Sequence, residues 1–179
     1  MINKIKISNN DKLVSLDITN MFGNIPRTEL IESLKRNKYN NNLNGLKYAD
    51  IIEEIIKQNY CQFNNNFYEQ TEGLAMGSPL PPILAEIYMN NFENNILNTS
   101  RYKQNVKLWC RYVDDILLIW NGTDRQLDQF FNETNNINEK IKFTIEKGNK
   151  TINFLDLTIQ IDRNKLKYNI IENQPIQTQ

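Results

Sequence analysis

The sequence contains no histidine and only two cysteines, Cys61 and Cys110. These absences exclude acid–base catalysis by histidine, zinc sites that use histidine, and a fold held by several disulfides. The 21 basic residues are balanced by 21 acidic residues, so the chain lacks the excess positive charge of a protein that grips nucleic acid unaided. Carboxylates remain the obvious catalytic groups.

Long apolar runs are also missing. The most apolar stretch, Ile116 to Trp120, is far too short to cross a bilayer, and the N-terminal residues lack the apolar core of a signal peptide. We therefore expect an intracellular protein, in the nucleus or the cytoplasm, without membrane contact. The 179 residues, 40% of them hydrophobic, suffice for one core, and no linker or internal repeat marks a domain boundary.

Periodicity and turn residues define the expected elements. Helices are predicted from about Pro26 through 28–35, and at 48–58, 79–97 and 123–135, with Ser78 as the N-cap before Pro79. Strands are predicted at 12–18, as a hairpin within 61–70, and at 106–112, 116–120, 142–146, 151–161 and 165–171. This order predicts an α+β fold in which helices pack on one face of an antiparallel sheet.

Two adjacent acids, Asp114 and Asp115, lie between two strongly apolar predicted strands. Because neighbouring side chains of a strand face opposite ways, both carboxylates converge only if the chain turns there. Converging carboxylates repel one another and resist ionisation unless a hard cation such as Mg²⁺ compensates. A solvent-exposed hairpin turn is the more common explanation of such a pair, since Asp is frequent in turns.

Two further features have both a functional and an ordinary explanation. Asp17 closes the first predicted strand, where it can line a site or simply meet water, and spacing does not show whether it lies near Asp114. Gly73 and Gly77 precede a predicted helix, where they would let the backbone approach a nucleotide or a template, although an ordinary flexible loop is the simpler explanation. No Gly-Lys-Ser/Thr follows them, so the loop does not fit a P-loop.

Taken in order, four segments resemble the motifs of the reverse transcriptase superfamily, and most closely those of Penelope-like retroelements. Residues 14–26 resemble motif A, and residues 70–93 resemble motif B with its following helix. Residues 111–116, Arg-Tyr-Val-Asp-Asp-Ile, resemble motif C, and residues 141–146 with 152–157 resemble motif D and the primer-grip region. Gly23 departs from the threonine usual in motif A, and Pro81 from the serine common in motif B.

The resemblance implies a polymerase palm over residues 1–171, followed by a tail at 172–179, with the fingers and thumb regions missing. It implies an RNA-directed DNA polymerase of a retroelement, which transfers deoxynucleotides from dNTPs to a primer 3′-hydroxyl along an RNA or DNA template. Asp17, Asp114 and Asp115 would hold two Mg²⁺ ions, for which Mn²⁺ can substitute.

The resemblance also implies contacts with the substrates. Phe22 would collide with a 2′-hydroxyl and so favour deoxynucleotides, although composition alone suggests a core aromatic. Lys147 would protonate pyrophosphate, although a surface lysine is the simpler explanation. The remaining predicted contacts with the nucleotide or template are Ile18, Gly73, Met76, Gly77, Ser78 and Tyr112. Met76 stands where many other reverse transcriptases have glutamine, which fits the Penelope-like branch.

Two alternatives stay open. One is a catalytically inactive, retroelement-derived nucleic-acid-binding or scaffold domain that keeps the acids by ancestry alone. The other is a two-metal nuclease, because paired carboxylates also cleave phosphodiesters, but it leaves Phe22 and the Gly-Ser-Pro loop without a role. Since much of the family's basic surface would belong to the fingers and thumb, we expect the isolated chain to extend a primer poorly.

Overall fold

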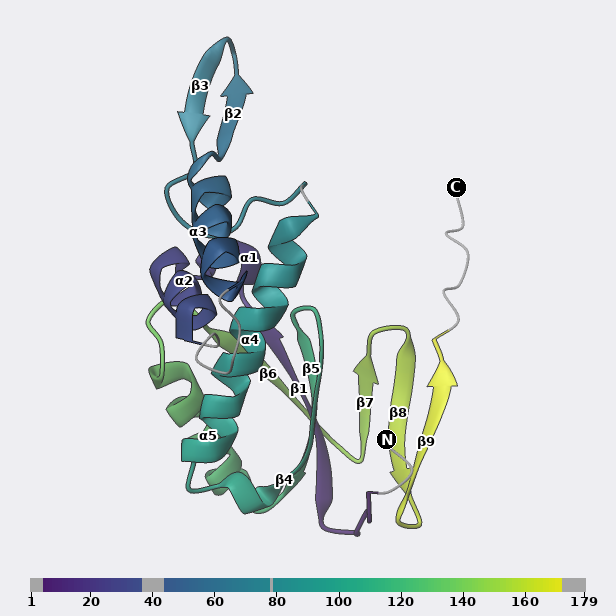
Figure 1. The fold of residues 1–179 in the computed structure, drawn as a ribbon. Helices are drawn as coiled ribbons and strands as arrows, with labels where there is room; N and C mark the ends of the chain where they lie inside the picture. The colour runs from purple at the N-terminus through teal and green to yellow at the C-terminus, as the bar shows by residue number, and fades with distance from the viewer. Residues whose placement is uncertain (1–4, 37–43, 78, 172–179) are drawn as a thin grey trace, which may run out of the picture. The chain divides into compact units, whose positions relative to one another are not determined.

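The computed structural model describes residues 5–36, 44–77 and 79–171 (Figure 1). Contacts between Cα atoms divide the chain into two compact units. The first unit is formed by Met1–Ile18, Ser100–Ile137 and Phe143–Gln179, and the second by Thr19–Thr99 and Asn138–Lys142. The first unit is therefore assembled from three separate stretches of the chain.

A four-stranded antiparallel sheet forms the centre of the first unit. Its strand order is β4 (Val106–Tyr112), β5 (Asp115–Asn121), β1 (Asp11–Ile18) and β6 (Phe143–Asn149). A short 3-10 helix, Lys103–Asn105, precedes β4. β5 lies between β4 and β1, and its residues 116–120 are apolar and buried on both faces of the sheet.

One face of this sheet is covered by a helix. Val14 and Leu16 point to this face together with Trp120, whose ring centroid lies 5.3 Å from that of Phe130 on α5 (Asp124–Asn136). Thr123 begins the helix with a capping box, in which its side chain accepts a hydrogen bond from the Gln126 backbone.

The opposite face is partly covered by a second antiparallel sheet. This sheet consists of β7 (Thr151–Phe154), β8 (Leu157–Asp162) and β9 (Lys165–Ile170) in that order. The buried residues that form the shared core are Leu13, Leu117, Ile119, Ile152, Ile159 and Ile161. Leu13, Ser15 and Asp17 lie on the same face of β1, and of these three residues only Leu13 belongs to the shared core. The core between the two sheets therefore lies at the end of this face that is remote from Asp17.

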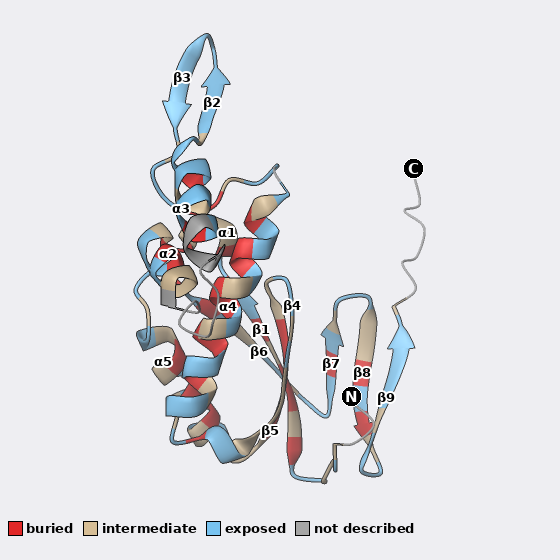
Figure 2. Ribbon diagram, in the orientation of Figure 1, coloured by how far each residue is buried: buried red, intermediate tan, exposed pale blue. Residues whose placement is uncertain are grey.

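The second unit is mainly helical. It contains α1 (Met21–Asn24), α2 (Arg27–Arg36), α3 (Asn44–Lys57) and α4 (Leu80–Thr99), and α2 packs against both α3 and α4. A hairpin of β2 (Tyr60–Phe63) and β3 (Asn66–Glu69) extends from the end of α3 and is exposed along its whole length (Figure 2). Its turn uses Asn64 and Asn65 at φ 48° and 61°, which is the conformation that favours asparagine in two-residue hairpins.

The predicted α+β class, with antiparallel sheets and helices, is confirmed. The single strand predicted at 151–161 is wrong, because the chain turns after Phe154, with Leu155 at φ 52°, and forms β7 and β8. The turn consists of Leu155 and Asp156, and the leucine between two apolar segments gives no turn signal. Helix α1 was not predicted, and the predicted N-cap Ser78 lies outside the described residues. Among the described helices, none is both long enough and apolar enough to span a bilayer.

Candidate active site

Three aspartates from distant parts of the sequence lie together in the first unit. Asp17, near the end of β1, is directly opposite Asp115, the first residue of β5. Directly paired residues of an antiparallel ladder have Cα atoms about 4.5–5.5 Å apart and point to the same face. Asp114 precedes Asp115 in the hairpin turn, and its backbone oxygen accepts a 3.0 Å hydrogen bond from the Ile18 amide.

The β4–β5 turn that presents these acids has an unusual backbone. Tyr112 pairs with Asp115, so only Val113 and Asp114 form the loop. Val113 has φ 56°, a left-handed conformation that costs a β-branched residue about 1–3 kcal/mol. Arg111 supports the turn, because its Nη1 donates a 3.0 Å hydrogen bond to the Val113 carbonyl.

The electrostatics of the cluster follow from its crowding. Partial burial raises the pKa of Asp115, and the negative charges of Asp114 and Asp17 raise it further. Among the residues that the structure describes, no group of three or more His, Cys, Asp or Glu side chains is arranged so that it alone could hold a metal ion.

A recess of about 240 Å³ opens beside two of these acids, entirely within the first unit. It is lined by Ser15, Asp17, Asp115, Thr144, Ile145, Glu146, Asn153, Phe154 and Leu155. The β7–β8 turn thus forms one wall, which places part of the predicted primer-grip segment next to the acids. Glu146, which pairs with Ser15 and shares its face, is not among the site residues predicted from the sequence. Only the register of β6 on β1 reveals that position.

The structure does not bring Lys147 to the acids. Lys147 pairs with Val14, so its side chain is on the α5 face of the sheet, where it forms an ion pair with Asp128. Its predicted role as the proton donor to pyrophosphate is therefore not supported by this geometry. Ile18 also points to the face opposite Asp17 and is almost completely buried, whereas Tyr112 pairs with Asp115, shares its face and is 62% exposed.

In the second unit, the predicted Phe22 and Gly73 lie in segments that are hydrogen-bonded to each other. The Phe22 backbone oxygen accepts a 2.7 Å hydrogen bond from the Leu74 amide. Gly73 has φ 69°, and a Cβ atom there would lie 2.3 Å from the Gly23 oxygen. This close approach requires glycine at position 73, whereas a Cβ atom at Gly23 would instead lie 2.5 Å from the Asn20 side-chain nitrogen.

The other predicted residues of this loop are more open. Gly77 has φ 115° and no atom within 4 Å of an added Cβ, so its backbone conformation rather than lack of space requires glycine. Met76 is 77% exposed, Pro81 is buried at the start of α4, and Ser78 lies outside the described residues.

The family described as "Reverse transcriptase (RNA-dependent DNA polymerase)" matches residues 2–169. This chain belongs to the reverse transcriptase family. The matched residues belong to both units and include the three aspartates, helix α1 with Phe22, and the β7–β8 turn.

Part of the chain is also similar in sequence to individual proteins. The telomerase reverse transcriptase of Euplotes aediculatus is 30% identical over 105 residues, which cover 54% of this chain and 10% of that protein. The putative COX1/OXI3 intron 2 protein of Saccharomyces cerevisiae is 26% identical over 85 residues, which cover 48% of this chain and 9% of that protein. The aligned parts of the chain thus span about a tenth of the length of these relatives.

Solved structures show the same fold. Telomerase from Candida albicans in complex with a TWJ fragment of telomeric RNA has a TM-score of 0.75 at 15% identity and covers 96% of this chain and 33% of that chain. Apo telomerase from Candida tropicalis has a TM-score of 0.70 at 14% identity and covers 92% of this chain and 33% of that chain. At such identities the likeness establishes the fold alone.

Proposed function

We propose that this chain carries the catalytic centre of an RNA-directed DNA polymerase, which transfers deoxynucleotides from dNTPs to a primer 3′-hydroxyl. The observation that carries the proposal is the pairing of Asp17 with Asp115, next to Asp114 in the same turn. Membership of the reverse transcriptase family over residues 2–169 supports it. A chance cluster of exposed turn acids would not be expected to coincide with the ordered motifs of that family.

Asp17, Asp114 and Asp115 would hold two Mg²⁺ ions, with Mn²⁺ as a substitute. The donor set fits these hard cations, because it offers carboxylate oxygens only. Partial burial raises the pKa of Asp115, and the charges of Asp114 and Asp17 add to the increase, so a cation would relieve a crowded anionic cluster. Mg²⁺ is commonly bound by one or two carboxylates, water and substrate phosphates, so a complete protein cage is not needed. When bound, the ions would activate the primer hydroxyl and stabilise the leaving pyrophosphate.

The residues of the second unit would act on the incoming nucleotide. Phe22 would exclude a 2′-hydroxyl by collision, and the backbone at Gly73 and Gly77 would allow close approach of nucleotide or template. Met76 and Ser78 belong to the same predicted surface, and Tyr112 to the surface beside Asp115. For Lys147 to protonate pyrophosphate, its side chain would have to lie on the face of the sheet that carries Asp17, instead of on the α5 face where it pairs with Asp128.

Nucleic acid would be the partner, as an RNA or DNA template with a primer. A telomerase with the same fold was solved in complex with telomeric RNA, which supports this proposal. Efficient synthesis would also need fingers and thumb regions outside the palm that we assign to residues 1–171. The source would be a retroelement of the Penelope-like branch, which Met76 supports. The similarity to a yeast intron protein is in keeping with a retroelement.

The test is Mg²⁺-dependent incorporation of dTTP on poly(rA)/oligo(dT), measured in single turnover with the chain in excess so that weak activity is detectable. Asp114→Asn should lower incorporation by at least about 100-fold, because removing a group that stabilises charge in the transition state has effects of this size. Asp50→Asn on α3, an exposed acid outside the cluster, is the matched control and should retain activity. Equal activity of Asp114→Asn and the wild-type chain would refute the assignment.

A further inference from the structure

Arg27, the first residue of α2, holds the loop between β3 and α4 by two hydrogen bonds. Its Nε donates to the Gly73 carbonyl at 2.7 Å, and its Nη2 donates to the Gln70 carbonyl at 2.6 Å. Neighbouring N–H groups of a planar guanidinium can engage two carbonyls at once, whereas the single ammonium of lysine lacks this fork. The Gln70 amide still donates a 2.9 Å hydrogen bond to the Asn59 carbonyl, but residues 71–77 contain no helix or strand, so no ladder of backbone hydrogen bonds fixes that part of the loop.

The loop held by Arg27 is also fixed to the backbone of Phe22. The Leu74 amide donates a 2.7 Å hydrogen bond to the Phe22 carbonyl, directly after the contact between Gly73 and Gly23. A side chain at Gly73 would strike backbone atoms that cannot move aside, so the two segments are in close contact by necessity. Arg27 therefore acts on Phe22 through Gly73 and Leu74.

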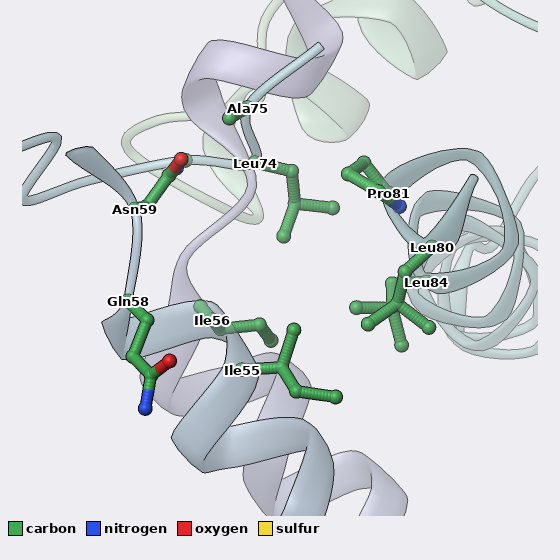
Figure 3. A pocket seen from close by; sticks show the side chains of 10 residues that line it. Ile55, Ile56, Gln58, Asn59, Leu74, Ala75, Leu80, Pro81 and Leu84 are labelled. Carbon is green, nitrogen blue, oxygen red and sulfur yellow. The ribbon is translucent and has the colours of Figure 1, made fainter. Parts of the chain in front are cut away.

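The Leu74 side chain provides a third attachment. It is buried and points into an apolar cavity of about 140 Å³ between α3 and α4, as Figure 3 shows together with Ile55, Ile56 and Leu84. The loop is thus anchored on one side by the Leu74 side chain and on the other side by hydrogen bonds to Arg27 and to the Phe22 carbonyl.

Phe22 needs such external support, because α1 is short. The helix has only four residues, its N-cap Asn20 has φ 45°, and the Asn20 side chain makes no capping hydrogen bond. A single helical turn is not stable by itself, since nucleation costs more than one turn returns. The direction of the Phe22 ring therefore depends on the segments that touch α1.

We propose that Arg27 is a positioning residue for sugar selection: it clamps the 70–74 loop onto the Phe22 backbone and so fixes the ring that excludes a 2′-hydroxyl. This inference rests on the proposed function, because Phe22 selects a sugar only if the chain incorporates nucleotides. Arg27 itself does not contact the substrate. Replacing Arg27 should weaken the discrimination between dTTP and UTP more than it lowers the rate of dTTP incorporation.

The experiment combines two measurements on the full chain. Hydrogen exchange of the Leu74 amide, followed by NMR, reports the clamp and needs no activity. The ratio of dTTP to UTP incorporation on poly(rA)/oligo(dT) in single turnover reports sugar selection. Arg27→Gln and Arg27→Lys are compared with Tyr88→Phe, which removes a hydrogen bond from α4 to Glu29 on α2 without touching the loop, and with Arg125→Gln on the exposed surface of α5.

Both Arg27 variants should accelerate Leu74 exchange by about tenfold or more, because each loses at least one charge-assisted hydrogen bond. Both should lower the dTTP preference by about tenfold, chiefly through faster UTP incorporation, and the lysine should fail to rescue it. Tyr88→Phe and Arg125→Gln should leave the ratio unchanged, which separates positioning from general destabilisation.

Three outcomes would overturn the inference. Unchanged Leu74 exchange in Arg27→Gln would show that no clamp exists, and faster exchange with an unchanged dTTP to UTP ratio would show that the clamp does not position Phe22. An equal loss of selectivity in Tyr88→Phe would show a merely structural role. Absence of dTTP incorporation by the wild-type chain would instead count against the proposed function, and with it against sugar selection.

Discussion

Asp11 and Asp115 lie near opposite ends of the β1–β5 ladder, and their surroundings shift the pKa of their carboxyl groups in opposite directions. Burial raises the pKa of Asp11, but hydrogen bonds from Lys107, Asn121 and Ser8 outweigh burial and lower it below 3.8. Burial also raises the pKa of Asp115, and the charges of its two neighbouring acids add to the increase. One aspartate therefore stabilises the fold as an anion, whereas the other opposes folding as an anion.

Asp115→Asn should raise the free energy of unfolding at pH 7 in the absence of divalent cations, by up to about 1 kcal/mol because solvent screens the partly exposed group. A raised pKa in the folded state means that protonation favours folding. The advantage of the asparagine should therefore disappear as the pH falls through the raised pKa towards the ordinary value of 3.8. Urea unfolding at pH 7 and at successively lower pH measures it.

Asp11→Asn is the opposing control. Its lowered pKa gives stability that is present above pH 3.8 and lost as the pH falls through the lowered value, so this variant should be less stable than the wild-type chain at pH 7. A loss of stability at pH 7 in Asp115→Asn as well would contradict the proposed repulsion among the three acids.

At the scale of elements, the β4–β5 hairpin combines strong strand formers with one strained residue. Its strands pair from Tyr112 and Asp115 outwards, and β5 is buried between β1 and β4. The packing of β5 therefore enforces a two-residue turn at Val113, although valine rarely adopts a positive φ. Strain of this kind persists only where surrounding structure determines the conformation, and here it lies at the acids.

Val113→Gly should raise the free energy of unfolding by about 1 kcal/mol, because glycine adopts this φ without strain and only part of the gain is offset by its greater freedom when unfolded. Thermal or urea unfolding measures it. Val106→Gly is the matched control, since Val106 begins β4, the strand that leads into this turn, with φ −84°, and the same substitution there should lower the free energy of unfolding. Equal losses in both variants would show that Val113 is not strained.

The helices and strands were largely predictable, because apolar periodicity is a local property of the chain. The β1, β4, β5 and α5 segments were predicted within about one residue of the observed bounds. The β7–β8 turn was not, because Leu155 gives no turn signal and adopts φ 52° only in the context of two packed strands. Helix α1 was missed because four residues are too few for a periodic pattern.

At the scale of the whole molecule, balanced charge limits how strongly the chain can bind nucleic acid. With 21 basic and 21 acidic residues, little favourable free energy is available from counterion release. Three of the acids also gather at the very surface that would receive a primer terminus. Under the proposed function, binding should therefore depend on divalent cations that offset the charge of these acids.

The chain should bind a primer–template duplex with a dissociation constant weaker than about 1 µM at physiological salt, the range of non-specific binding. The affinity should fall only shallowly with salt, with a log–log slope smaller in magnitude than about 3. Fluorescence anisotropy at several salt concentrations measures both quantities. Nanomolar binding with a steep slope would reveal a basic surface that compensates for the balanced charge.

The chemistry of the site could be predicted from the residues alone, because they include carboxylates but no histidine, in ordered motifs that resemble reverse transcriptases. Which of these groups meet depends on how distant segments pair in the fold. The register of β6 on β1 pairs Glu146 with Ser15 and Lys147 with Val14, which sends Glu146 to the face of Asp17 and Lys147 to the opposite face. Since one residue of slip exchanges the two faces of a strand, such positions depend on pairing between distant segments and not on local pattern.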